Sequence, residues 1–195
     1  MTGKRETIYN CAKELFTEKG FKDTNVADIT KQAGMATGTF YNYYPSKDKL
    51  FMDIYMEENR KLKESILAGI DQDGDPAQVM NRMIYLNYTG MLANPILKEW
   101  YNRDVFNKIE QNFRAESGAR GADFLYYTFA DVVKKWQAQG KMRADISSEM
   151  IMTIFAAIVN IDVHKEEVGL QYFPQVLNYI SDFVMQGLTD CSKDG

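Results

Sequence analysis

Two short helical patterns separated by a glycine lie within residues 24–50 of this chain. Thr24 is a residue type favoured at helix N-caps, and Val26 and Ile29 after it recur at the spacing of one helix face. Gly34 ends this first helix, because glycine adopts the left-handed backbone conformation without a clash from a Cβ atom. Two helices joined by so tight a turn must cross steeply, so the pattern predicts a helix-turn-helix.

The second of these helices carries polar and aromatic residues on its outer surface. Thr37 is expected to cap it, and Phe40 and Tyr44, four residues apart, are expected to face inward. Asn42 matches the hydrogen-bonding edge of adenine, whereas threonine methyls and tyrosine rings suit the thymine methyl group and the phosphates. The outward residues are Thr37, Gly38, Thr39, Tyr41, Asn42 and Tyr43. We therefore predict that this helix reads bases in the DNA major groove.

The residues after the second helix offer a candidate phosphate contact. Pro45 ends that helix, and Ser46 is placed to cap the next one. Lys47 then lies where backbone amides and a positive charge converge on an anion, so we predict that it contacts a DNA phosphate. The alternative is a packed three-helix unit whose polar residues are merely solvated, because short motifs of this kind also occur without DNA binding.

A run of motifs extends almost without gaps over the first fifty residues. The motifs are Ile8, Ala12, Leu15, Phe16, EKGF at 18–21, Thr24, DIT at 28–30, AG at 33–34, GTFYNYYPSK at 38–47 and Leu50. This run resembles the N-terminal DNA-binding domain of the TetR family of transcriptional regulators. The resemblance implies an all-α protein, with an N-terminal three-helix helix-turn-helix DNA-binding domain followed by a helical ligand-binding and dimerisation domain.

The resemblance also implies roles for individual residues. It makes Thr24 a phosphate contact, places residues 37–39 and 41–43 against the duplex, and puts Lys47 on a phosphate. Two positions depart from the family pattern, since Ala27 stands where a basic residue is frequent and Tyr43 where histidine is common. These departures bear on which operator sequence is read, because phosphate contacts position a protein on DNA while base contacts specify the sequence.

Charge and composition narrow the functional classes. The net charge is -4, yet residues 1–49 hold eight Lys and Arg against six Asp and Glu, so this head is +2 and the remainder is -6. A mildly basic head on an acidic body favours one docking orientation on DNA, with random scatter as the alternative. We expect the affinity for DNA to fall as salt rises, because phosphate neutralisation releases counterions.

Metal, cofactor, membrane and enzyme functions find no support in the sequence. Cys11 and Cys191 are too few for a disulfide framework, and His164 lacks a cysteine partner at metal spacing, so we interpret it as a solvated or capping residue. No leader peptide or bilayer-spanning apolar run is present, and a cytoplasmic location is expected. No Ser/His/Asp set, paired carboxylates or phosphate-cradling glycine loop stands out, so we expect neither a cofactor nor catalysis.

The remaining chain has helical patterns throughout. Helices are expected over 47 to about 70, 76 to about 93, 96–117 with a break near 102, 122–139, 147 to about 164, and 174 to about 188. The DQDGDP run at 71–76 and the ESGARG run at 116–121 are expected loops. We place the DNA-binding domain at 1–48 and the body at 49–195, which includes a linker helix to about residue 70.

The middle helices carry the candidates for binding a small-molecule effector. With eleven methionines in the chain, their aromatic and amide side chains could enclose an adaptable and mostly apolar cavity. Each of them could instead belong to the core. The candidates are Asn87, Tyr88, Trp100, Tyr101, Phe124 and Tyr127. The chemistry of the effector is not readable from these residues.

Two apolar stripes on the last two helices are the candidates for a partner surface. They could build a four-helix interface across a two-fold axis, which is how the resemblance implies dimerisation. The alternative is that the stripes only close the core of the monomer. The residues are Ile151, Ile154, Phe155 and Ile158 in one stripe, and Phe173, Val176, Leu177, Ile180 and Val184 in the other.

These features favour a homodimeric, ligand-responsive transcriptional regulator, most often a repressor in this family, on a pseudo-palindromic operator. Ligand in the body would move the linker helix and change the separation of the two reading helices. A helical adaptor that retains the fold without operator binding is the main alternative. An enzyme acting on a small aromatic molecule is a remote one.

Overall fold

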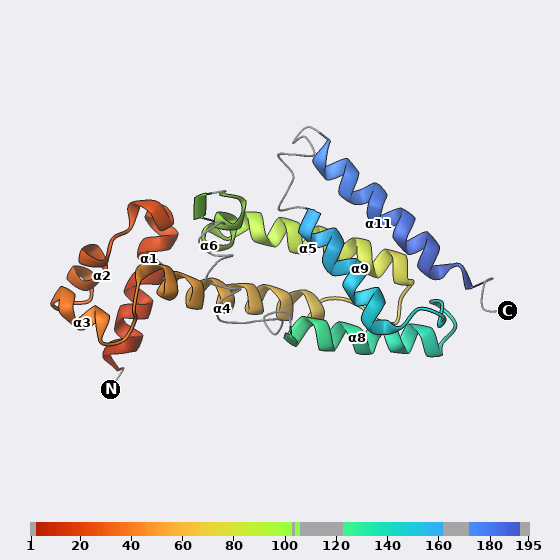
Figure 1. Ribbon diagram of the computed structural model, residues 1–195, viewed down its shortest axis with the longest axis horizontal. Helices are drawn as coiled ribbons and strands as arrows, with labels where there is room; N and C mark the ends of the chain where they lie inside the picture. The colour runs from red at the N-terminus through yellow and green to blue at the C-terminus, as the bar shows by residue number, and fades with distance from the viewer. Residues whose placement is uncertain (1–2, 103, 106–122, 162–171, 192–195) are drawn as a thin grey trace. The chain divides into compact units, whose positions relative to one another are not determined.

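The computed structural model describes residues 3–102, 104–105, 123–161 and 172–191, with the backbone alone at 123–128, 159–160 and 173–174. Within these ranges every regular element is helical and no strand occurs (Figure 1). The helices are α1 (Lys4–Asp23), α2 (Val26–Gln32), α3 (Thr37–Tyr41), α4 (Lys47–Ala68), α5 (Pro76–Ala93), α6 (Pro95–Lys98), the 3-10 helix η1 (Glu99–Tyr101), α8 (Asp123–Ala138), α9 (Ser148–Ile161) and α11 (Phe173–Thr189). The prediction of an all-α fold is confirmed.

Most predicted helices have their expected bounds. Helix α5 begins at Pro76 and ends at Ala93, and α8 ends at Ala138, two residues before Gly140 with its positive φ of 65°. The helical segment expected from residue 96 begins with α6 and η1, and the extended backbone of Asn102 agrees with the expected break near residue 102. Residues 106–117 of this segment lie outside the described residues. The predicted loop at 116–121 and His164 lie outside the described residues.

The chain divides into two compact units. The first comprises Met1–Ser65 and Asn87–Gly121, and the second comprises Ile66–Leu86 and Ala122–Gly195. The divisions fall inside α4 and α5, so each of these helices contributes residues to both units. The predicted boundary after residue 48 separates functional domains, whereas these units are defined by compactness alone. The boundary therefore stays a prediction.

Aromatic rings form the centre of the first unit. The rings of Phe16 and Phe51 meet edge to face with centroids 5.0 Å apart, and those of Phe21 and Phe51 lie 4.8 Å apart. Ile8 and Phe40 are fully buried in the same cluster. This core fixes α1, α3 and the start of α4 against one another, which holds the short α3 in place despite its length.

The second unit has a separate core between α8, α9 and α11. Trp136 is fully buried there, and its indole Nε1 donates a hydrogen bond of 2.9 Å to the carbonyl oxygen of Gln72. The ring of Phe129 meets it edge to face at 6.0 Å. Among the described helices, none is both long enough and apolar enough to cross a membrane.

Candidate nucleic-acid interface

A complete Schellman motif forms the turn between α2 and α3. Gly34 has a φ of 66°, and its amide donates to the carbonyl of Lys31 at 3.2 Å. The amide of Met35 donates to the carbonyl of Thr30 at 2.8 Å, so the last carbonyls of α2 are satisfied. The prediction that Gly34 ends the first helix of the motif is confirmed.

The N-cap of α2 is Asn25 rather than Thr24, so this prediction is wrong. The side chain of Asn25 accepts a hydrogen bond of 2.8 Å from the amide of Asp28. Thr24 is fully buried, and its hydroxyl donates to the carbonyls of Gly20 at 2.8 Å and Leu15 at 3.3 Å. A buried hydroxyl cannot reach a phosphate, which removes the Thr24 side chain from the candidate DNA contacts.

Helix α3 begins one residue away from the predicted cap. Ala36 occupies the N-cap without a side-chain hydrogen bond, and Thr37 is the first helical residue. Phe40 and Tyr44 are buried, at 0% and 3% exposure, as their spacing predicted. The inner face of the recognition helix is therefore fixed by packing.

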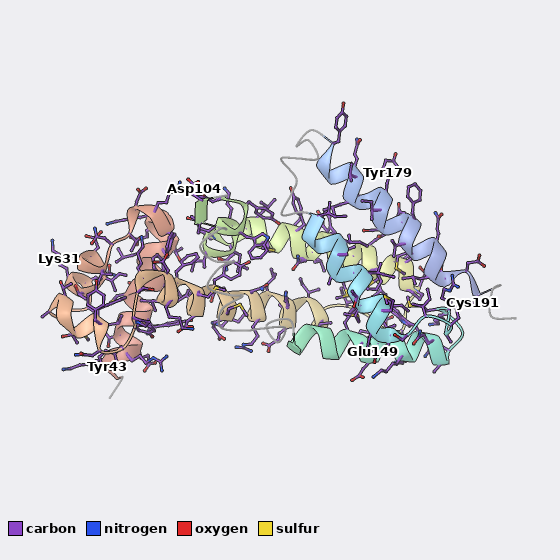
Figure 2. All side chains as sticks on the ribbon, in the orientation of Figure 1. Lys31, Tyr43, Asp104, Glu149, Tyr179 and Cys191 are labelled. Atoms are coloured by element: carbon purple, nitrogen blue, oxygen red, sulfur yellow. The ribbon has the colours of Figure 1, made fainter. Side chains whose placement is uncertain are left out.

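The opposite face of α3 is open. Tyr41 is 57% exposed and Tyr43 38% exposed, and Figure 2 labels Tyr43 at the surface of the first unit. The exposed residues of this face are Thr37, Gly38, Tyr41, Asn42 and Tyr43, with Thr39 half-buried beside them. We call these six residues the reading surface. A carboxamide flanked by two phenols presents both hydrogen-bonding groups and ring edges to a partner.

Lys47 has a different environment from the one predicted. Ser46 does cap α4, since its Oγ accepts from the amide of Lys49 at 3.1 Å. The Nζ of Lys47, however, donates to the carbonyls of Phe21 and Thr24, each at 2.6 Å, and lies 4.2 Å from the centroid of the Phe21 ring. The ammonium group thus clamps the junction between α1 and α2 instead of pointing at an approaching anion.

A carboxylate holds the same junction from another side. Glu99 of η1 accepts a hydrogen bond of 3.0 Å from the amide of Phe21 through Oε1, and one of 3.1 Å from the side chain of Asn102 through Oε2. Gly20, with a φ of 79°, makes the approach possible, because a Cβ there would lie 2.8 Å from Glu99 Oε1. The sequence offered no signal for this contact, which joins residues far apart in the chain.

Arg5 is a further cation beside the reading surface. Its guanidinium carbon lies 5.4 Å from the centroid of the Tyr44 ring, and its side chain is exposed. A hydrogen bond to Tyr44 raises the pKa of Arg5, so the group stays charged. The adjacent basic residues Lys4 and Arg5 at the start of α1 are the signal in the sequence for this cation.

The candidate effector residues of the first unit are half-buried and interact with one another. The rings of Tyr88 and Tyr101 meet edge to face at 6.3 Å, and Trp100 stacks on Tyr55 at 5.8 Å. Asn87 and the Tyr101 hydroxyl both donate to the sulfur of Met91, at 3.7 and 4.0 Å. The side chains of the other two candidates, Phe124 and Tyr127, lie outside the described residues.

The apolar stripes predicted for a partner surface are mostly inside the second unit. Ile151, Phe155, Ile158 and Leu177 are buried, with exposures of 0 to 9%. Ile154, Ile180 and Val184 are partly buried against the same core, Val176 is half-buried, and the side chain of Phe173 lies outside the described residues. Burial in the monomer core removes the four buried residues from the partner surface. These four residues close the core of the monomer.

Helix α11 instead exposes a different pair of rings. Tyr179, labelled in Figure 2, is 61% exposed and Phe183 is 65% exposed. Their rings stack with centroids 6.1 Å apart and an interplanar angle of 20°. Met150 of α9 is 54% exposed. A stacked pair of exposed rings on one helix is a candidate partner surface.

Comparisons with known proteins agree with this geometry. Residues 8–54 match the family model described as bacterial regulatory proteins, tetR family. The uncharacterized HTH-type transcriptional regulator YvdT of Bacillus subtilis (strain 168) is 24% identical over 191 residues, which cover 86% of this chain and 92% of YvdT.

Solved structures share the fold. FadR of Thermus thermophilus, a TetR-family repressor in complex with lauroyl-CoA, has a TM-score of 0.62 at 23% identity, covering 96% of this chain and 94% of FadR. RolR in complex with resorcinol has a TM-score of 0.69 at 14% identity, covering 97% of this chain and 90% of RolR. These similarities confirm a helix-turn-helix DNA-binding domain followed by a helical domain.

Proposed function

We propose that this chain, whose residues 8–54 match the family model of the tetR regulatory proteins, is a ligand-responsive repressor that binds a pseudo-palindromic operator as a homodimer. The single observation that carries the proposal is the reading surface of α3. Its outer residues are exposed while Phe40 and Tyr44 anchor the helix from below. A short, rigidly held helix with an exposed carboxamide suits base reading in the major groove.

The contacts we assign differ between the residues of the reading surface. Asn42 is assigned to a base edge, because its amide can donate and accept at once, as an adenine edge requires. Tyr41 and Tyr43 are assigned to phosphates and thymine methyl groups, and Arg5 to a phosphate beside them. The phosphate contacts set the register of the protein on DNA, and Asn42 contributes to the choice of sequence.

We assign the two-fold contact to the exposed face of α11. Tyr179 and Phe183 supply the apolar anchors, which are the residue types that dominate protein interfaces. A symmetric pair of chains would present two copies of α3, and these would read two half-sites related by the same axis. The operator is then expected to be an inverted repeat.

The hydrogen bonds of the Phe21 backbone with Glu99 and Lys47 provide a route from effector to DNA. Trp100, which stacks on Tyr55 of α4, is adjacent in sequence to Glu99, which holds the amide of Phe21. A ligand that displaces η1 would therefore act on the helix-turn-helix through Glu99 as well as through α4. Its differential affinity for the two arrangements supplies the energy of the switch.

The test is DNA binding by matched alanine variants. Asn42→Ala should weaken binding to the DNA upstream of the gene of this chain about 10- to 100-fold, since one bidentate base contact contributes about 1–3 kcal/mol. Gln78→Ala, at an exposed amide of the second unit, should leave the affinity unchanged. Fluorescence anisotropy with labelled duplexes measures both.

The adaptor function makes the opposite prediction. A folded wild-type protein that protects no site in footprinting of its source genome would support an adaptor, and Ala27, exposed on α2 where a phosphate contact is frequent, gives that alternative its basis. Equal affinities of Asn42→Ala and wild type would likewise remove the base contact from the proposal.

A further inference from the structure

Two polar side chains of α4 lack partners within the part of the chain that the structure describes. The Oδ1 atom of Asn59 is buried and makes no hydrogen bond. Lys63, one helical turn later, is partly buried and forms no hydrogen bond or ion pair with the described residues. Burial lowers the pKa of Lys63, and no carboxylate among the described residues offsets that effect. Both groups lower the stability of the fold, because a buried amide or ammonium without a partner loses its hydration and gains no hydrogen bond in exchange.

The other charges in the middle of α4 are paired, which makes Lys63 an exception. Arg60 bonds to Glu57 and Glu64 on either side of it. Lys61 lies 3.4 Å from Glu58, whose carboxylate also accepts from Lys13 and Asn94. The position four residues before Lys63, where an acidic residue could pair with it, holds Asn59.

Helical spacing places the two groups on one side of α4 together with apolar residues. Asn59 and Lys63 are four residues apart, so they lie on the same face. Met56 and Met52 precede Asn59 by three and seven residues and lie on this face as well, half-buried and buried respectively. The face therefore combines one ammonium, one amide and two thioethers, and it carries no carboxylate.

We propose that this face of α4 binds the acid group of the effector, with the ammonium of Lys63 pairing with a carboxylate or phosphate and the amide of Asn59 forming a second hydrogen bond. The half-buried Met56 contacts the apolar remainder of the same molecule, since its flexible thioether adapts to irregular shapes. The inference rests on the proposed ligand response and narrows it to effectors that carry an acid group.

The amide of Asn59 can serve an anion at little cost. A half-turn of the side-chain amide exchanges its oxygen and nitrogen, so the position now held by an acceptor becomes a donor position. An acid group then receives hydrogen bonds from both side chains. A neutral ligand, by contrast, would bury Lys63 further and leave its charge unpaired, which disfavours binding.

A purely structural reading of Lys63 predicts different behaviour. In that reading the aliphatic stem covers apolar surface and the ammonium extends to water, so that no ligand is involved. Acids would then bind wild type and a Lys63 variant alike. The two readings are separated by measuring ligand binding and stability on the same variants.

The experiment uses the full chain and two matched sets of probes at concentrations up to about 1 mM. The first set is decanoate, decyl phosphate and decan-1-ol. The second set is benzoate, phenyl phosphate and benzyl alcohol. Calorimetric titration should show binding of at least one acid and much weaker binding of its matched alcohol. The carboxylate and phosphate arms identify which acid group is preferred. Failure of every acid to bind wild type would overturn the inference.

Three variants test the residues. Lys63→Met should weaken acid binding at least about tenfold. Asn59→Asp should do the same, because its carboxylate would pair with Lys63 in place of the ligand. Lys61→Met, an exposed lysine of the same helix, should bind within about twofold of wild type. Unchanged acid binding by Lys63→Met would overturn the inference.

Folding and DNA binding are measured on the same proteins. Lys63→Met should melt no lower than wild type, because it removes a charge that burial disfavours. If wild type binds operator DNA but no acid, this inference fails and the regulator proposal stands. If it binds acids but no DNA, the regulator proposal fails and the acid site stands.

Discussion

Helices α3 and α11 both leave aromatic side chains in water, yet the surroundings of those side chains differ. Tyr41 and Tyr43 flank an exposed carboxamide, whereas Tyr179 and Phe183 stack on each other at 6.1 Å. Polar groups between rings favour a partner rich in hydrogen-bonding edges, and paired rings favour an apolar one. The neighbours of the exposed rings therefore distinguish the two surfaces, and on this basis we propose DNA as the partner of α3 and protein as the partner of α11.

The largest expected effect comes from charging the α11 surface. Phe183→Asp should convert a dimer into a monomer, because an aspartate would be buried without a partner at the two-fold contact. Operator affinity should fall by about 100-fold or more, since each chain would then bind a half-site alone. Sedimentation velocity measures the first effect and anisotropy the second.

A matched control separates this effect from charge alone. Gln78→Asp adds the same charge at an exposed position of α5, and it should remain dimeric. If Phe183→Asp stayed dimeric with full operator affinity, the two aromatic surfaces would no longer be distinguished by their partners, and α11 would lose its assigned role.

The next largest effect concerns Lys47, which holds the junction between α1 and α2. Lys47→Met should destabilise the protein by about 2–3 kcal/mol, because two charge-assisted hydrogen bonds to the carbonyls of Phe21 and Thr24 are lost. Urea denaturation measures this loss. The matched control is Lys31→Met, an exposed lysine of α2, which should change stability by less than about 0.5 kcal/mol.

The salt dependence of DNA binding decides what Lys47 does. A clamp predicts that log K against log salt keeps its slope in Lys47→Met, whereas a phosphate contact predicts a slope smaller by about 0.9. A reduced slope with unchanged stability would restore the contact that sequence reading assigned to Lys47.

Local signals allowed most of the helix-turn-helix to be predicted. Glycine at the C-terminus of α2, the Ser46 cap of α4 and the spacing of Phe40 and Tyr44 act over a few residues, so the sequence contains them in full. The N-cap of α2 was missed because Thr24 and Asn25 are both good caps, and only tertiary packing buried the first.

The rest of the candidate site depends on contacts between distant residues. An apolar stripe on a helix looks the same whether it faces its own core or another chain, which is why Ile151 and Leu177 were assigned to the wrong surface. The hydrogen-bond partner of the Phe21 amide could not be predicted either, since Glu99 lies 78 residues away in the sequence. Pairings of this kind follow from the packed structure and have no local pattern.

The smallest predicted effect tests whether that distant pairing serves the reading surface. Glu99→Ala should cost about 1–2 kcal/mol of stability, because the amide of Phe21 is left without its acceptor. It should also reduce the change in operator affinity that an effector produces, because displacement of η1 would no longer be transmitted through Phe21. Asp104→Ala removes the exposed ion pair with Lys22, and should change stability by less than about 0.5 kcal/mol while keeping the full response. Anisotropy titrations with and without the acid probes measure the response, and an undiminished response in Glu99→Ala would assign the coupling to α4 alone.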